Sequence, residues 1–303
     1  MPIAERRRCD TGKPGEYMTS ADSLTERIFD AHGVPVNCAL GPASGPPLLL
    51  LHGIAERWQT FLPVISLLTP RWQVYALDLR GHGRSGRVRN GYQIVGYARD
   101  IDHFLRSDIR QPAVILGHSI GALIAIYLAA AQPQLVKMVV LVDPPLHLQH
   151  TPLKAVPNGP YEAFKRIIAI LQASGSTQAI ERALVEQFPG GEKANHQARA
   201  EVLSQLDPGT LASLLEGRHV KGLNLDALLR RMRCPTLLIQ GNPKRGAALW
   251  DEDVDRALTL LSHGARISIP GGGHMLHHSH PEVIASAVND FYDLSFGATE
   301  RQG

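Results

Sequence analysis

The sequence has few cysteines, few aromatic residues and little net charge. Only three of its 303 residues are cysteine, and Cys9, Cys38 and Cys234 lie too far apart to form a disulfide framework or a CxxC metal motif. The 31 basic and 28 acidic residues are interspersed and leave a formal charge of +3, which marks no surface for nucleic acid or membranes. We therefore expect a cytoplasmic protein without such partners.

Long apolar runs are also absent. No stretch approaches the roughly 18 apolar residues of a membrane span, and the N-terminal segment lacks the apolar stretch of a signal peptide. Residues 1–20 are predicted to be a flexible tail. The chain as a whole is 44% hydrophobic and 19% charged, as is usual for a globular protein with a sizeable core.

Short, solid apolar runs alternate with helical patterns along most of the chain. Such runs indicate strands that are covered on both faces, and their alternation with helices indicates a mostly parallel sheet of the α/β class. The principal runs occupy residues 47–53, 74–81, 113–119, 138–144, 235–241 and 265–274.

The alternation is interrupted once. Residues 146–232 contain helical patterns and no clear strand, although strands are predicted on either side. We interpret this segment as a helical cap inserted after the sixth strand, over the edge of the sheet where α/β proteins bind ligands. The core then comprises residues 21–145 and 233–303.

The segment Gly117–Gly121 reads GHSIG and satisfies the G-x-S-x-G pattern. A serine in this pattern lies on a tight turn between a strand and a helix, which exposes its hydroxyl at the edge of the sheet. Here an apolar strand pattern precedes the motif and an apolar helical pattern follows it. Ser119 is therefore the predicted nucleophile.

A histidine-rich loop near the C-terminus, GGGHMLHHSHPE, supplies the predicted general base. His274 follows three glycines at the end of a predicted strand, and imidazole exchanges protons near neutral pH. His277, His278 and His280 are a weaker indication of a metal site. No acidic residue lies among them in the sequence, so we expect no metal.

Four segments in this order resemble the α/β-hydrolase superfamily: HGIAERW, DLRGHGRS, GHSIG and GGGH. The capped members of that superfamily include esterases, lactonases and carbon–carbon bond hydrolases. The resemblance implies that Ser119 is the nucleophile and His274 the base, and that no cofactor is needed. It also implies an oxyanion hole formed by the backbone amides of Ile54 and Ile120.

The catalytic acid departs from the common pattern. Many members carry it three residues after the glycine that ends the seventh strand, but here that position is Lys244. Asp143, at the end of the sixth predicted strand, is the preferred substitute. The alternatives are the acidic cluster at the start of a predicted helix, or no acid at all; the cluster is Asp251, Glu252 and Asp253.

These residues favour hydrolysis of a small ester or lactone through an acyl-enzyme. One alternative is carbon–carbon bond hydrolysis of a diketone-like acid, which needs a cation in the pocket; Arg57 and Lys244 are the candidates. The other alternative is a ligand receptor with weak turnover, since the usual acid is missing. The helical cap carries no motif that names the substrate.

Overall fold

The structure is a computed structural model that describes residues 24–189 and 193–297; the predicted tail at residues 1–20 lies outside these ranges. Eight strands form one sheet in the order β1-β2-β4-β3-β5-β6-β7-β8. The strands β1 and β2 form an antiparallel hairpin, and the six strands β3 to β8 run parallel to one another. Their bounds are Thr25–Ala31, Val34–Leu40, Pro47–Leu51, Gln73–Leu77, Ala113–His118, Val136–Val142, Thr236–Gln240 and Gly264–Ser268. The predicted α/β class is confirmed.

The central strands are buried on both faces, as the solid apolar runs predicted. In β3, Leu48 and Leu50 belong to one apolar core and Leu49 and Leu51 to the other, and none of the four is exposed. Successive side chains of a strand point to opposite faces, so a solid run supplies both cores at once. Each such leucine contributes on the order of 2 kcal/mol through burial.

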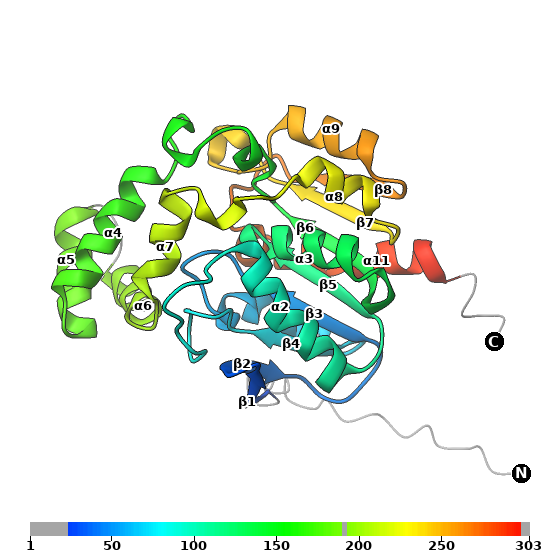
Figure 1. Cartoon of the computed structure of the whole chain (residues 1–303), viewed down its shortest axis with the longest axis horizontal. Helices are drawn as coiled ribbons and strands as arrows, with labels where there is room; N and C mark the ends of the chain where they lie inside the picture. The colour runs from blue at the N-terminus through cyan, green and yellow to red at the C-terminus, as the bar shows by residue number, and fades with distance from the viewer. Residues whose placement is uncertain (1–23, 190–192, 298–303) are drawn as a thin grey trace, which may run out of the picture.

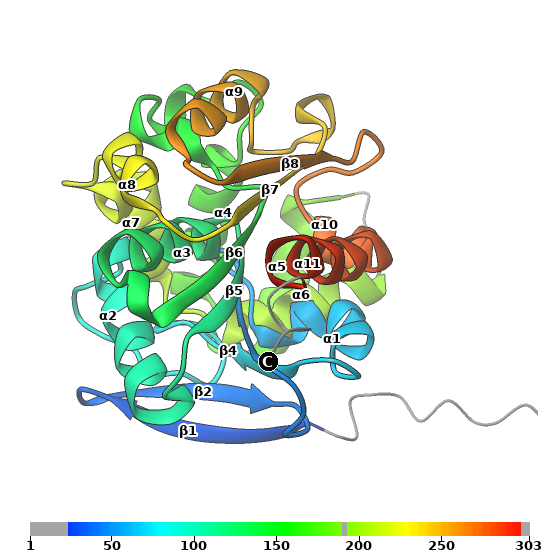
Figure 2. The same ribbon diagram turned by 90° about the vertical axis from the view of Figure 1, so that its right-hand side faces the viewer.

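Helices cover both faces of the sheet (Figure 2). Two helices lie on one face, α1 (Leu62–Leu68) and α11 (Pro281–Phe296). The opposite face is covered by α2 (Ile94–Phe104), α3 (Ile120–Ala131), α8 (Leu225–Arg231) and α9 (Asp251–Leu260). A short helix, α10 (Leu276–Ser279), precedes α11.

Four further helices lie together at one end of the molecule, beside the core (Figure 1). They are α4 (Tyr161–Ala173), α5 (Thr177–Gln187), α6 (Lys193–Ser204) and α7 (Pro208–Leu215), all between β6 and β7. Their apolar side chains form a separate core that includes Ile167, Leu184 and Leu203. The helix α8 belongs elsewhere: the sequence pattern included it in the cap, but Leu225 and Leu229 pack into the core of the sheet. Among the described residues, no helix has both the length and the apolar character needed to cross a membrane.

Candidate active site

Ser119 lies on the turn between β5 and α3, and its backbone has the strained φ of 53°. The turn is tight because glycines flank the serine. A Cβ atom on Gly121 would overlap the carbonyl oxygen of Leu51, and one on Gly117 would overlap the carbonyl of Gly121. The chain can therefore reverse only with glycine at these two positions, and a strained backbone held by its surroundings is common at functional sites.

Asp143 lies directly after β6 and contacts the predicted base. Its Oδ2 atom is 2.6 Å from Nδ1 of His274, and its side chain has no exposed surface. The backbone amides of Ala248 and Leu249 donate to the same carboxylate at 2.7 and 3.1 Å. Three nitrogen atoms thus converge on Asp143 and fix the orientation of its buried carboxylate.

The alternative acids lie away from His274. Asp251 accepts a hydrogen bond from Gln240 at 2.9 Å, and Asp253 pairs with Arg256 at 2.7 Å. With Glu252, they occupy the first turn of α9, where negative charge complements the helix dipole. The structure therefore places Asp143, and none of this cluster, beside the histidine.

Two buried histidines hold the loop that follows β3. His52 Nε2 accepts from the amide of Leu79 at 3.0 Å, and His82 Nε2 accepts from the amide of Ala55 at 3.2 Å. Burial lowers the pKa of His52 to about 4 and that of His82 to about 3, so both rings are neutral at pH 7 and able to accept. The amide of Ile54 in this loop has no hydrogen-bond acceptor among the described residues.

Ile120 is the first residue of α3, so its amide has no partner one turn earlier in that helix. The amides of Ile54 and Ile120 therefore both remain available to an oxygen atom in the site. Preorganised amides of this kind stabilise the negative charge of a tetrahedral intermediate.

A cavity of about 690 Å³ opens onto these groups. Ser119, His274, Ile54 and Ile120 line it. Much of the remaining lining comes from the segment between β6 and β7, with Leu148, Leu153, Val156, Phe164 and Leu214. A largely apolar cavity with a few convergent polar groups is typical of a small-molecule site.

His147 is a polar group of the cavity that the sequence analysis did not identify. Its ring stacks on Trp250 at 4.2 Å, and its Nδ1 lies 3.0 Å from the carbonyl oxygen of Ala248. Burial lowers its pKa, which favours the neutral ring.

Arg199, on α6, was also missed, because the helical cap carried no readable motif. It lines the cavity and donates from Nη1 to the carbonyl oxygen of Ala55 at 3.0 Å. Of the two cations that the sequence offered for the pocket, Lys244 lines the cavity as an exposed residue. Arg57 instead lies 3.9 Å from Glu201 in a salt bridge.

The histidines of the histidine-rich loop lie in different environments. His277 is fully buried, with Nε2 3.6 Å from Glu56 Oε2, whereas His278 is exposed. His118 Nδ1 lies 3.0 Å from the other oxygen of Glu56. The acidic partner that was missing from the local sequence therefore comes from the loop after β3, more than 200 positions earlier in the chain.

Three ligand atoms of Glu56, His118 and His277 lie within 4.8 Å of one another, close enough to share a metal ion. Burial raises the pKa of Glu56, but the two histidines outweigh burial and hold that pKa well below its ordinary value. A carboxylate that already pairs with imidazole satisfies its charge without a metal.

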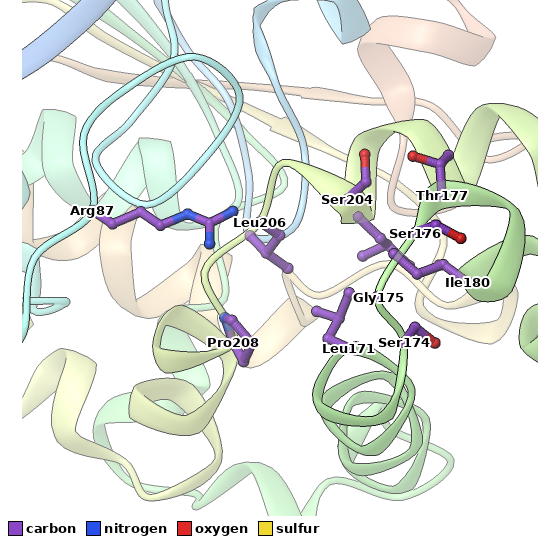
Figure 3. Close-up of a pocket in the computed structure, with 11 residues that line it drawn as sticks. Arg87, Leu171, Ser174, Gly175, Ser176, Thr177, Ile180, Ser204, Leu206 and Pro208 are labelled. Carbon is purple, nitrogen blue, oxygen red and sulfur yellow. The ribbon is translucent and has the colours of Figure 1, made fainter.

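A second cavity, of about 410 Å³, lies among the inserted helices (Figure 3). Its lining includes Arg87, Ser174, Ser176 and Leu206, and Figure 3 shows Arg87 on the side opposite the two serines. Ser119, Asp143 and His274 do not line it. Of the groups predicted for catalysis, Ser119 and His274 line the first cavity, and Asp143 is buried behind His274.

The fold is that of the α/β hydrolases, with Ser119 and His274 lining one cavity, and comparison with known sequences agrees. The sequence profile described as "Alpha/beta hydrolase family" matches residues 48–287. The chain belongs to this family and is an enzyme, a hydrolase.

Individual relatives share most of their length with the chain. It is 30% identical over 283 residues to a 2-(acetamidomethylene)succinate hydrolase of Mesorhizobium japonicum, covering 90% of this chain and 97% of that protein. It is 27% identical over 251 residues to a pimeloyl-[acyl-carrier protein] methyl ester esterase of Stenotrophomonas maltophilia, covering 82% and 93%. The crystal structure of an E-2-(acetamidomethylene)succinate hydrolase superimposes with a TM-score of 0.72 at 26% identity, covering 89% of this chain and 99% of that one.

Proposed function

We propose that this protein hydrolyses a carboxylic ester or lactone of a small molecule through an acyl-enzyme on Ser119. The observation that carries the proposal is the contact between His274 Nδ1 and Asp143 Oδ2, beside a cavity that Ser119 also lines. A carboxylate at Nδ1 holds the ring with Nε2 free to accept a proton and stabilises the imidazolium that forms.

The chemistry follows from these positions. His274 takes the proton of Ser119 as the hydroxyl attacks the carbonyl carbon, and the amides of Ile54 and Ile120 stabilise the oxyanion. His274 then protonates the leaving alcohol, which departs from the acyl-enzyme. Water, activated by His274, releases the acid and regenerates Ser119. None of these reaction steps needs a cofactor.

The relatives support cleavage at a carbonyl carbon. One group is named for a methyl ester, and the 30% identical relative is named for 2-(acetamidomethylene)succinate. The contact between Asp143 and His274 also favours catalysis over the receptor alternative, which rested on the lysine at position 244.

The free thiols of Cys38 and Cys234 agree with a reducing compartment, and we place the enzyme in the cytoplasm.

A second candidate is carbon–carbon bond hydrolysis of a diketone-like acid. This reaction requires a cation in the cavity, and Arg199 supplies one. Turnover of a vinylogous diketone acid, without turnover of simple esters, would favour this candidate over ester hydrolysis.

The test is labelling of the purified protein with a fluorophosphonate probe, followed by peptide mass spectrometry. We expect one adduct, on Ser119, that is lost in Ser119→Ala and strongly reduced in His274→Ala. His278→Ala is the matched control, since His278 lies on the same loop but is exposed. A folded protein that is not labelled, or is labelled equally after His274→Ala, contradicts the proposal.

A further inference from the structure

One half-buried positive charge of the cavity has no anionic partner among the residues that the structure describes. Arg199 reaches from α6 into the cavity that Ser119 lines, and its one hydrogen bond among the described residues goes to a neutral group, the carbonyl oxygen of Ala55. No carboxylate of the described part of the chain lies within salt-bridge distance of it. The guanidinium thus keeps N–H donors that no protein carboxylate satisfies.

Burial makes this arrangement costly. It lowers the pKa of Arg199 below its ordinary value, while the charge of Glu56 acts in the opposite direction. Glu56 is nevertheless not the missing partner, because its two oxygens lie at His118 and His277. A largely desolvated cation without a paired anion is unfavourable unless a ligand supplies the anion.

The surroundings indicate the kind of anion. Arg199 is a single half-buried cation, with the carboxylate of Glu56 close enough to affect its pKa. One guanidinium matches the charge and the planar geometry of one carboxylate, whereas a phosphate dianion would meet too little positive charge and the repulsion of Glu56. Lys244 is exposed, so solvent weakens its attraction for an anion and it does not act as a second desolvated charge.

We propose that Arg199 binds a carboxylate group of the substrate, so that the enzyme prefers esters that carry a free carboxylate over neutral esters of the same shape. This inference rests on the proposed function, since it assigns a substrate class to the same cavity. The carbonyl of Ala55 holds the guanidinium beside the loop that contains Ile54, which keeps the carboxylate close to the reacting carbonyl.

The experiment compares ester pairs in which only the charge changes. On the acyl side, the pair is mono-4-nitrophenyl adipate and 4-nitrophenyl adipamate. On the alcohol side, it is 4-carboxyphenyl hexanoate and 4-carbamoylphenyl hexanoate. The measured quantity is the preference, defined as kcat/KM of the carboxylate ester divided by that of its carboxamide. We expect the native enzyme to prefer the carboxylate in at least one pair.

The variants assign that preference to one residue. In Arg199→Met we expect the preference to fall about 10- to 100-fold, the value of a charge-assisted contact. Arg199→Lys should keep an intermediate preference because it keeps the charge but loses the planar fork. Arg182→Met is the matched control: Arg182 is an exposed arginine of α5, and its removal should leave the preference unchanged.

Two results would overturn the inference. One is that the native enzyme shows no preference for the carboxylate ester in either pair, and this result can be obtained without any variant. The other is a preference that survives Arg199→Met, which would leave Arg199 with only its structural contact to the carbonyl of Ala55. Failure of the proposed function would give a different result from either of these. The fluorophosphonate would then not label Ser119, whatever the charge of the ester.

Discussion

His274 Nδ1 and Asp143 Oδ2 lie 2.6 Å apart, although 131 positions separate the two residues in the chain. The loop after β7, where related enzymes commonly carry the acid, here donates two backbone amides to Asp143 instead. Asp143, which we propose as the acid, lies at the end of the neighbouring strand β6, and the loop after β7 supports it with hydrogen bonds.

Asp143→Asn should lower kcat/KM about 1,000-fold or more while the protein stays folded. The amide cannot stabilise imidazolium on His274, and its NH₂ group would favour the wrong tautomer of the ring. Initial rates on an ester substrate, with circular dichroism as the check on folding, measure the effect. Asp251→Asn is the control, because Asp251 bonds to Gln240 rather than to His274. Loss of activity in the control, with retention in Asp143→Asn, would refute the assignment.

Gly121→Ala should destabilise the protein by about 3 kcal/mol and abolish the reactivity of Ser119. The new methyl group would meet the carbonyl of Leu51, so the turn that presents the serine would have to open. Urea denaturation and fluorophosphonate labelling report the two effects. Gly175→Ala is the matched change, since no atom lies within 4 Å of its Cβ position. Equal stability of the two variants would show that the turn is less tight than described.

Stability should fall as the pH is lowered from 7 to 5. The folded protein holds His52 and His82 with pKa values of about 4 and 3, below the ordinary value of 6.5. The unfolded chain therefore binds more protons in this range, and each histidine costs on the order of 2 kcal/mol of unfolding free energy between pH 7 and pH 5. Below the folded pKa values the loss levels off.

The His52→Asn variant tests the source of that pH dependence. It should be less stable at pH 7, because asparagine replaces the bond to Leu79 imperfectly, but its stability should change less between pH 7 and pH 5. Chemical denaturation at several pH values gives both quantities. An unchanged slope would mean that other groups titrate on unfolding.

Removal of metal ions should leave hydrolysis unchanged, because Glu56 already pairs with His118 and His277. Dialysis against a chelator, with activity and metal content measured before and after, checks this. Glu56→Gln should instead lower the melting temperature, since two buried histidines lose their anionic partner. Stoichiometric metal whose removal abolishes activity would contradict the expectation and identify these three residues as a metal site.

The local pattern of the sequence was sufficient for the elements of the core. The solid apolar run in β3 predicted a strand buried on both faces, and GHSIG predicted a turn at Ser119, because both depend on residues only a few positions apart. The sequence pattern placed α8 in the cap, whereas in the structure α8 packs against the core of the sheet. Its helical pattern was readable, but the partner against which a helix packs is not encoded in its own periodicity.

By itself, the sequence determined the fold class, the nucleophile turn and a short set of candidate acids. Only the tertiary structure decided which groups meet: Asp143 with His274, Glu56 with His118 and His277, and Arg199 with the cavity of Ser119. Each of these contacts joins segments that are distant in the chain. The order of the strands and the path of the inserted helices bring them together, and both result from burial of apolar surface over the whole molecule rather than from any local motif.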